Sequence, residues 1–174
     1  MFNHVNHGFL LEELSADLSE KGRLYTTPTG AVFPSVTTVL GMQDKSGLDA
    51  WWKRVGDAEA NRIMSQAATR GTAVHELAEK YVNNDPDWKK GAMPANLFTF
   101  NTVKSVLDKH LDNVWIQEAP LYSEKLSVAG RVDCIAEWDG ELSIIDYKTS
   151  RRPKLVQYIE GYFIQESVYA ACFY

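Results

Sequence analysis

AGRVDCIAEWDGELSIIDYKTS, residues 129–150, is the stretch of the chain that decides the fold. It is typical of two strands joined by a tight turn at Asp139–Gly140, because both central residues of a type I′ turn need positive φ and Asp and Gly tolerate it. The turn also sets the register of the two strands. If Trp138 pairs with Glu141, the partners of all earlier residues can be counted from the turn. The sequence therefore predicts a β-hairpin with a defined register.

Charged residues meet at the open end of this hairpin. Counting places Asp133 opposite Asp146, with Cβ atoms about 5 Å apart. Lys148 shares the face of Asp146, because side chains two residues apart in a strand point the same way. Opposed carboxylates repel, and one of them has a raised pKa. A divalent cation such as Mg²⁺ removes this repulsion and takes waters and phosphate oxygens as its other ligands. Lys148 would then activate the metal-bound water or stabilise charge on a phosphate.

The alternative interpretation is a surface hairpin in which Asp146 and Lys148 form a solvated salt bridge. For an isolated D-x-K this alternative would be favoured. The register match, the apolar run at residues 142–145 and the flanking Gly130 favour a metal site instead.

Two segments of the hairpin carry a family resemblance. The G-x-x-D run at residues 130–133, followed by an apolar strand that ends in I-D-Y-K-T at residues 145–149, resembles the PD-(D/E)XK nuclease superfamily. The similarity is to its RecB-like exonuclease branch, and it extends over about residues 33–169. It implies an α/β, restriction-endonuclease-like fold, in which a mixed central β-sheet is flanked by helices and the N-terminal half is helical.

A second motif lies in an expected helix at residues 68–82, which begins around Arg70-Gly71-Thr72. R-G-T-x-x-H-x-x-x-E resembles the RecB-like motif whose His binds the metal together with the hairpin carboxylates. The resemblance implies that His75 is a metal ligand and that Arg70 contacts a DNA phosphate. The alternatives are a hydrogen-bonded boundary histidine and a salt bridge at the helix start. Because imidazole suits Mn²⁺ better than Mg²⁺, we expect one or two ions of either kind.

The resemblance adds further site residues. It implies that the Tyr147 backbone carbonyl is a metal ligand and that Glu118 is an acid beside the site and a further candidate ligand, although a strand Glu is often simply exposed. Gln165 and Tyr169 form the Q-x-x-x-Y pattern of this branch on an expected helix at residues 155–174, where their spacing puts both on one face. The family uses this pair to orient the catalytic lysine and the strand. Many unrelated helices contain the same pattern.

A basic loop follows the hairpin. Four cations within residues 148–154 favour backbone phosphate contacts over a merely solvated loop. P-S-V-T-T-V-L at residues 34–40 resembles a segment near the start of the related exonucleases, and Ser35 there is also a plausible helix N-cap. Trp51 lies in a region that forms an arch over the active site in the related exonucleases. If its side chain is exposed it would stack on bases, and the alternative is that it packs in the core. The expected DNA contacts are Arg70, Ser35, Trp51, Thr149, Arg151, Arg152 and Lys154.

Hydrophobic periodicity predicts the remaining elements. We expect helices at about 10–18, 36–40, 48–68 and 96–111, a hairpin at 24–33, a loop at 83–95, and a strand at 114–119 continuing through 121–123. The chain is expected to form one nuclease domain over 1–174. Its parts are an N-terminal segment (1–33), a helical arch and His-helix region (34–111), and a catalytic sheet core with the Q-x-x-x-Y helix (112–174).

Composition excludes several classes of protein. Net charge is −5, so a nucleic-acid surface must be a local basic patch. The two cysteines, Cys134 and Cys172, are too few for a disulfide framework or an iron–sulfur site. No apolar run approaches the roughly 18 residues of a membrane span, and no signal or transit peptide is recognisable. We expect a cytoplasmic protein of a bacterium or of a phage-infected cell.

These observations predict a metal-dependent nuclease that hydrolyses DNA phosphodiester bonds. The interpretation is an exonuclease that acts on single-stranded or end-frayed DNA in replication, recombination or repair, with possible protein partners from those processes. One alternative is a structure-selective endonuclease on the same core. The other is a catalytically inert module that binds DNA ends. Nucleotide-cofactor and zinc-finger functions lack their motifs, because there is no G-x-G-x-x-G, phosphate loop or paired C-x-x-C.

Overall fold

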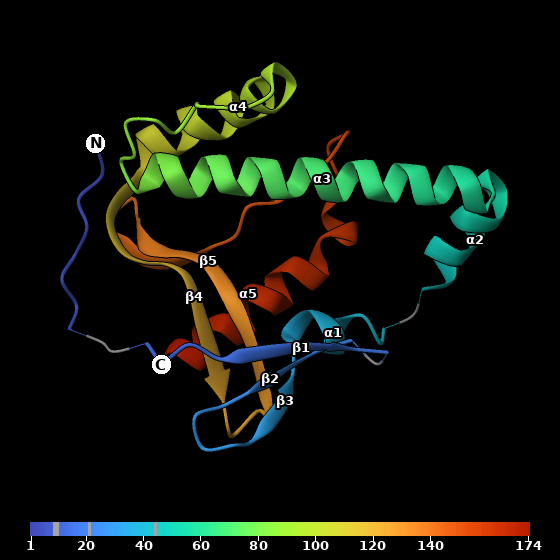
Figure 1. Ribbon diagram of the computed structural model, residues 1–174, viewed down its shortest axis with the longest axis horizontal. Coiled ribbons are helices and arrows are strands. Elements are labelled where there is room, and N and C mark those ends of the chain that lie inside the picture. The colour runs from blue at the N-terminus through green and yellow to red at the C-terminus, as the bar shows by residue number, and fades with distance from the viewer. Residues whose placement is uncertain (9–10, 21, 44) are drawn as a thin grey trace.

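The computed structural model describes residues 1–8, 11–20, 22–43 and 45–174. An N-terminal sheet is followed by a helical middle and then by a C-terminal sheet with one last helix (Figure 1). The strands are β1 (Ser15–Ser19), β2 (Gly22–Thr26), β3 (Val32–Pro34), β4 (Leu111–Ser123), β5 (Val128–Trp138) and β6 (Glu141–Ile145). The helices are α1 (Val36–Leu40), α2 (Ser46–Val55), α3 (Asp57–Val82), α4 (Pro94–His110), the 3₁₀ turn η1 (Val156–Tyr158) and α5 (Glu160–Phe173).

The hairpin of β5 and β6 has the predicted register. Trp138 pairs with Glu141, and the ladder continues to the pair Cys134–Ile145. Asp139 and Gly140 both have positive φ, 52° and 84°, as a type I′ turn requires. Asp146 follows β6 directly, one step beyond the last pair. The hairpin prediction is therefore confirmed.

The C-terminal sheet has the order β4-β5-β6, with both pairs antiparallel. Short connections enforce this, because parallel neighbours need a long crossover. Among the described residues outside the named strands, parallel pairing appears as the isolated bridges His4–Val114 and Ser35–Ala129. The predicted α/β class with flanking helices is confirmed, and the parallel component of its sheet is confined to such bridges.

The predicted helix boundary near residues 68–72 is wrong. The break falls at Gly56, whose φ of 82° cannot continue a helix, and α3 then runs for 26 residues through Gly71. An interior glycine costs a helix only about 1 kcal/mol relative to alanine, which a long packed helix tolerates. Thr72, expected at the start of a helix, therefore lies inside α3.

The N-terminal segment differs from the expected helix at 10–18. Residues 15–19 form strand β1, which pairs with β2 along its length; Leu10 lies outside the described residues. Leu14 is buried against Tyr25 and Ala129, whereas Leu18 is 84% exposed. Pairing with β2 therefore overrides the helical spacing of the leucines, while the predicted hairpin at 24–33 is confirmed as β2 and β3.

Strand β4 extends the predicted strand at both ends. It includes Pro120, which pairs with Arg131. Proline is tolerated there because β4 is an edge strand of its sheet. It has a neighbouring strand on one side only, so the missing proline N–H need not leave a ladder hydrogen bond unmade. The predicted helix at 96–111 is confirmed as α4, which has Pro94 in its first turn.

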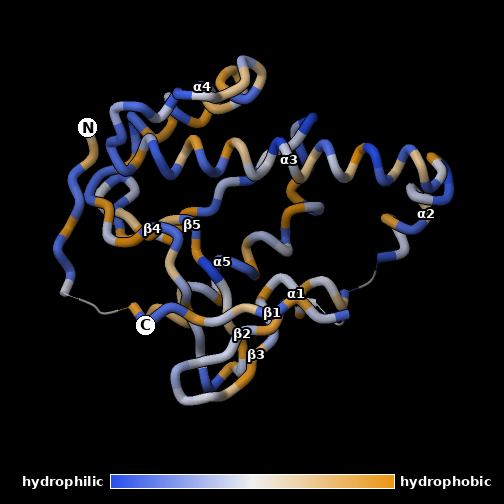
Figure 2. Tube along the Cα trace, in the orientation of Figure 1, coloured by the Kyte–Doolittle hydropathy of each residue, from blue (hydrophilic) through white to orange (hydrophobic). Residues whose placement is uncertain are grey.

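Helices cover the C-terminal sheet from two sides. On β5, Cys134 and Ala136 pack with α3 and α4, whereas the intervening Ile135 packs with α1 and α5. Figure 2 shows the matching alternation of apolar and polar residues along α3, which crosses above β4 and β5. None of the described helices is long and apolar enough to cross a membrane. The open end of the hairpin thus lies between α3 and α5.

Candidate metal and nucleic-acid site

Three elements bring one ligand group each to a common point. His75 from α3, Glu118 from β4 and Asp133 from β5 offer ligand atoms that all lie within 4.8 Å of one another. His75 Nδ1 is 3.3 Å from Asp133 Oδ2. Two carboxylates with one imidazole form a donor set suited to Mn²⁺ and acceptable to Mg²⁺. The sequence prediction of His75 and Asp133 in one site agrees with this geometry, and Glu118 joins them.

Strand register places Glu118 opposite Asp133. The neighbouring pairs are Gln117–Cys134 and Ala119–Val132, so Glu118 and Asp133 occupy the position between them. Burial, followed by the Asp133 charge, raises the pKa of Glu118 above its usual range. Burial also raises the pKa of Asp133, against the opposing effect of the Tyr147 N–H, which donates to Asp133 Oδ2 at 2.8 Å. Glu118 and Asp133 are therefore two partly buried carboxyl groups close together, and a bound cation would offset both their mutual repulsion and the cost of burying their charges.

Asp146 lies beside this group, in a second cluster. Its side chain is only 4% exposed. Oδ1 accepts a hydrogen bond from Gln165 Nε2 at 3.2 Å. Oδ2 forms an ion pair with Lys148 Nζ, yet it has no hydrogen bond of regular geometry among the described residues. A buried carboxylate oxygen needs such compensation. Charge links the clusters, since Asp146 contributes to the raised pKa of Asp133.

Lys148 is held by more than Asp146. Its side chain is 34% exposed, and its Nζ lies 5.3 Å from the centre of the Tyr162 ring. Lys154 approaches the same ring at 4.8 Å and also donates to the Tyr162 hydroxyl. Tyr162 was not among the site residues predicted from the sequence. Its position one helical turn before Gln165 was the available signal, because residues three apart share a helix face.

Gln165 and Tyr169 are buried on the face of α5 that points toward the site. Burial raises the pKa of the Tyr169 phenol, against an opposing effect of the Gln165 side chain one helical turn away. The ring packs directly on Gly130, where a Cβ atom would lie 2.5 Å from Tyr169 Cε1 and 2.8 Å from its Oη. The glycine of the G-x-x-D run therefore makes room for the tyrosine of Q-x-x-x-Y.

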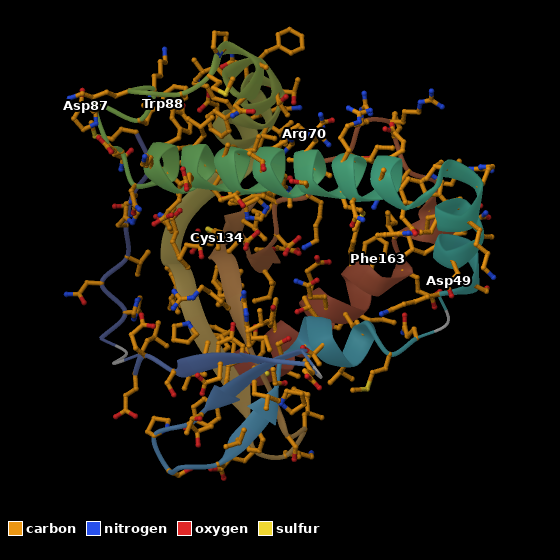
Figure 3. The ribbon with its side chains drawn as sticks, turned by 45° about the vertical axis from the view of Figure 1, so that its right-hand side comes forward. Asp49, Arg70, Asp87, Trp88, Cys134 and Phe163 are labelled. Atoms are coloured by element: carbon orange, nitrogen blue, oxygen red, sulfur yellow. The ribbon has the colours of Figure 1, made fainter. Side chains whose placement is uncertain are left out.

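Two cavities of opposite charge adjoin at the site. A cavity of about 590 Å³ is lined by Arg23, Gly71, Thr72, His75, Glu76, Glu79, Glu118, Arg131 and Asp133. A second, of about 490 Å³, is lined by residues 148–154 with Ile159 and Tyr162, and four of these are cations. Gly71 and Thr149 meet where the cavities adjoin, because a Cβ at Gly71 would lie 3.7 Å from Thr149 Oγ1. Figure 3 shows α3, which carries Arg70, passing above β5 with Cys134 and α5 with Phe163.

The expected DNA contacts lie in different settings. Arg151, Arg152 and Lys154 are exposed, and they line the cationic cavity together with the half-buried Thr149. Arg70 and Trp51 are half-buried on α3 and α2, where Trp51 meets Trp52 edge to face at 6.1 Å. Ser35 is buried, and its Oγ accepts from the Thr38 N–H at 2.9 Å, which confirms the predicted N-cap. A strand has no access to that hydroxyl, so we leave Ser35 out of the DNA surface.

Two charged residues near the site were also missed. Glu166 follows Gln165 on α5, and burial together with the Asp146 charge raises its pKa. Arg131 donates through Nη1 to the Glu118 carbonyl and through Nη2 to Glu13 Oε2 at 2.8 Å. The signal for Arg131 was its position two residues before Asp133, which places both on one face of a strand.

A hairpin that carries carboxylates and a paired lysine, crossed by a helix that supplies a histidine, is the arrangement expected of a metal-dependent nuclease core. The family model of the PD-(D/E)XK nuclease superfamily matches residues 46–173. The chain therefore belongs to this superfamily, and the resemblance drawn from the hairpin motifs is confirmed.

Three curated proteins that are similar to this chain share one name. The chain is 31% identical over 133 residues to mitochondrial genome maintenance exonuclease 1 of Homo sapiens, a match covering 71% of this chain and 38% of the relative. It is 26% identical over 129 residues to the Mus musculus protein of that name, covering 70% and 38%. The Xenopus tropicalis protein is 28% identical over 129 residues, covering 70% and 37%. The chain thus spans well under half the length of these relatives.

Proposed function

We propose that this protein is a metal-dependent deoxyribonuclease, acting as an exonuclease on single-stranded or end-frayed DNA during replication, recombination or repair. The observation that carries the proposal is the convergence of His75, Glu118 and Asp133 within 4.8 Å, beside the buried Asp146–Lys148 pair. Membership of a nuclease superfamily supports it, as do relatives that are named exonucleases.

The side chains at the site fit a hard divalent cation. His75, Glu118 and Asp133 would hold it, and the buried Asp146 Oδ2, which has no regular hydrogen bond among the described residues, is the further ligand that a second contact or a second ion would use. The Tyr147 carbonyl completes the proposed set. When bound, Mg²⁺ or Mn²⁺ would supply Lewis acidity to the scissile phosphate and lower the pKa of a bound water.

The protein groups would place and activate the attacking water. Lys148 Nζ, held between Asp146 and the Tyr162 ring, would orient that water as an ammonium. After losing its own proton to solvent, the neutral amine would instead take the proton of the water. Gln165 donates to Asp146, and Asp146 in turn pairs with Lys148. Together with the Tyr162 ring, these contacts would hold the lysine in the fixed position that phosphoryl chemistry requires.

The DNA backbone would lie along the cationic cavity. Arg151, Arg152 and Lys154 would contact successive phosphates beside Lys148, with Thr149 as a hydrogen-bond donor. Arg70 and Trp51 would extend the path over α3 and α2. Because the whole chain carries −5, this local patch would supply the attraction, and binding would weaken with salt.

The test is cleavage of end-labelled DNA with Mg²⁺, Mn²⁺ or chelator. Linear single strands should be degraded with metal only, and a covalently closed single-stranded circle should survive. Asp133→Asn should abolish cleavage. The control Asp139→Asn, at the turn of the same hairpin, should not. Cleavage of the circle would replace the exonuclease with an endonuclease, and inactivity on every substrate with both metals would refute the proposed function.

A further inference from the structure

Glu118 has a backbone conformation that residues with a side chain rarely adopt. Its φ is 47°, inside strand β4, whereas the positive-φ residues Asn84, Ser127 and Asp139 lie in turns. A residue held in this left-handed region persists only when its surroundings impose the conformation. The strain coincides with the candidate metal site, because the Glu118 carboxylate is the one that approaches His75 and Asp133.

Arg131 is the side chain that contacts this strained backbone. Its Nη1 donates to the Glu118 carbonyl, and its Nη2 donates to Glu13 Oε2 at 2.8 Å. A planar guanidinium presents its donors in a fixed fork, so the two bonds orient each other. Arg131 also lines the cavity that contains His75, Glu118 and Asp133. The N-terminal segment thereby reaches the site through Glu13.

We infer that Arg131 is a positioning residue of the metal site, holding the backbone of Glu118 in the left-handed conformation that aims its carboxylate at His75 and Asp133. Glu13 anchors the far side of the guanidinium. The inference rests on the proposed function to the extent that the site binds a divalent cation. Groups that orient a metal ligand typically contribute ten- to a hundred-fold to metal affinity.

The sign of the effect separates positioning from plain electrostatics. A cation beside a metal site repels the metal, so removing the charge of Arg131 should strengthen binding if charge alone matters. If Arg131 holds Glu118 in place, removing it should weaken binding. Arg131→Lys keeps the charge but loses the planar fork, so electrostatics predicts little change for this variant and positioning predicts a loss.

The experiment is titration of the metal-free protein with Mn²⁺ by calorimetry. We expect Arg131→Met to weaken Mn²⁺ binding about ten-fold and Arg131→Lys to weaken it several-fold. Glu13→Gln should weaken it less, because Arg131 keeps its bond to the Glu118 carbonyl. Arg62→Met, which removes an exposed arginine paired with Glu59, is the matched control and should leave the affinity unchanged.

A double-mutant cycle tests the route of the effect. In a Glu118→Gln background, Arg131→Met should cause little further loss, because the carboxylate that it positions is gone. Equal or tighter Mn²⁺ binding by Arg131→Met would overturn the inference, and so would a loss fully additive with Glu118→Gln. If the unmodified protein binds no Mn²⁺, the proposed function fails instead, so the two failures are distinguishable. Thermal unfolding of each variant verifies that the protein titrated is folded.

Discussion

The packing of Tyr169 on Gly130 permits a quantitative test of how the two motifs cooperate. In Gly130→Ala, the added Cβ would lie 2.5 Å from Tyr169 Cε1, 2.8 Å from Oη and 3.0 Å from Cζ. Ordinary contacts between such atoms are longer than 3.4 Å. The ring would therefore have to move by roughly 1 Å, and a buried ring in a packed core moves only at a cost.

We expect Gly130→Ala to lower the free energy of unfolding by about 1–3 kcal/mol, the usual cost of overpacking a core. Urea denaturation followed by tryptophan fluorescence measures this, and an unchanged m-value indicates that the transition stays two-state. Tyr169 and Gln165 are the buried residues of α5 and lie one turn apart, and Gln165 donates to Asp146. A shift of the helix that makes room for the displaced ring should therefore also lower kcat while leaving DNA binding largely intact.

A second substitution tests whether Tyr169 is the cause. Tyr169→Leu removes all three atoms that the new methyl group would meet, so adding Gly130→Ala to it should cost much less than in the unmodified protein. The coupling free energy should be about 1–2 kcal/mol. Gly161→Ala, on the same helix, is the control, because a Cβ there meets nothing within 4 Å. A Gly130→Ala variant within about 0.5 kcal/mol of the unmodified protein, the usual range of surface changes, would refute the reasoning.

Three further predictions concern the site. Lys148→Ala should retain Mn²⁺ binding while cleavage falls by at least about 100-fold, as measured by calorimetry and single-turnover kinetics. Burial raises the pKa values of Asp133 and Glu118, so the free energy of unfolding of the metal-free protein should fall as pH rises through these raised values. Asp133→Asn should reduce that loss. Mn²⁺ at 100 times its Kd should add about 2.7 kcal/mol to the free energy of unfolding of the unmodified protein at pH 7. Replacing Arg151, Arg152 and Lys154 with alanine should lower the slope of log affinity against log salt by about 0.7 for each single-strand phosphate that the variant no longer neutralises.

Each of these predictions has its own control. Lys109→Ala, on α4, should leave cleavage unchanged, so a similar loss there would remove Lys148 from the mechanism. If Asp133→Asn leaves the pH dependence of metal-free stability unchanged, the folded state does not raise the pKa of Asp133. If the salt slope stays constant in the triple variant, the DNA backbone does not lie along the cationic cavity.

Local chemistry was enough to place the hairpin acids. Asp139 and Gly140 specify the turn, the turn specifies the register, and the register carries Asp133 and Asp146 to the same end. Periodicity likewise located α4 and the Q-x-x-x-Y face of α5. These features follow from interactions between residues that are close in sequence, so their prediction needs no knowledge of the remaining chain.

The helix boundaries show where local information ends. Gly56 and Gly71 are both glycines flanked by residues of helical pattern, yet Gly56 ends α2 whereas Gly71 lies within α3. Packing of α3 against the sheet and α4 decides between them, because the cost of one interior glycine is small compared with the apolar burial that a continuous helix provides. Leu18, within the expected helix at 10–18, likewise lies in strand β1 because it pairs with Arg23 of β2.

The sequence alone predicted which residues would carry the chemistry: the hairpin carboxylates, the lysine and the histidine of α3. The family resemblance had already placed Glu118 beside the site, whereas only the tertiary structure decided that Arg131 contacts the Glu118 backbone and that Tyr162 faces Lys148. The physical reason is that a left-handed residue in a strand and a contact between distant elements depend on how the sheet and helices pack. That packing free energy is summed over the whole core and is not encoded in any short segment.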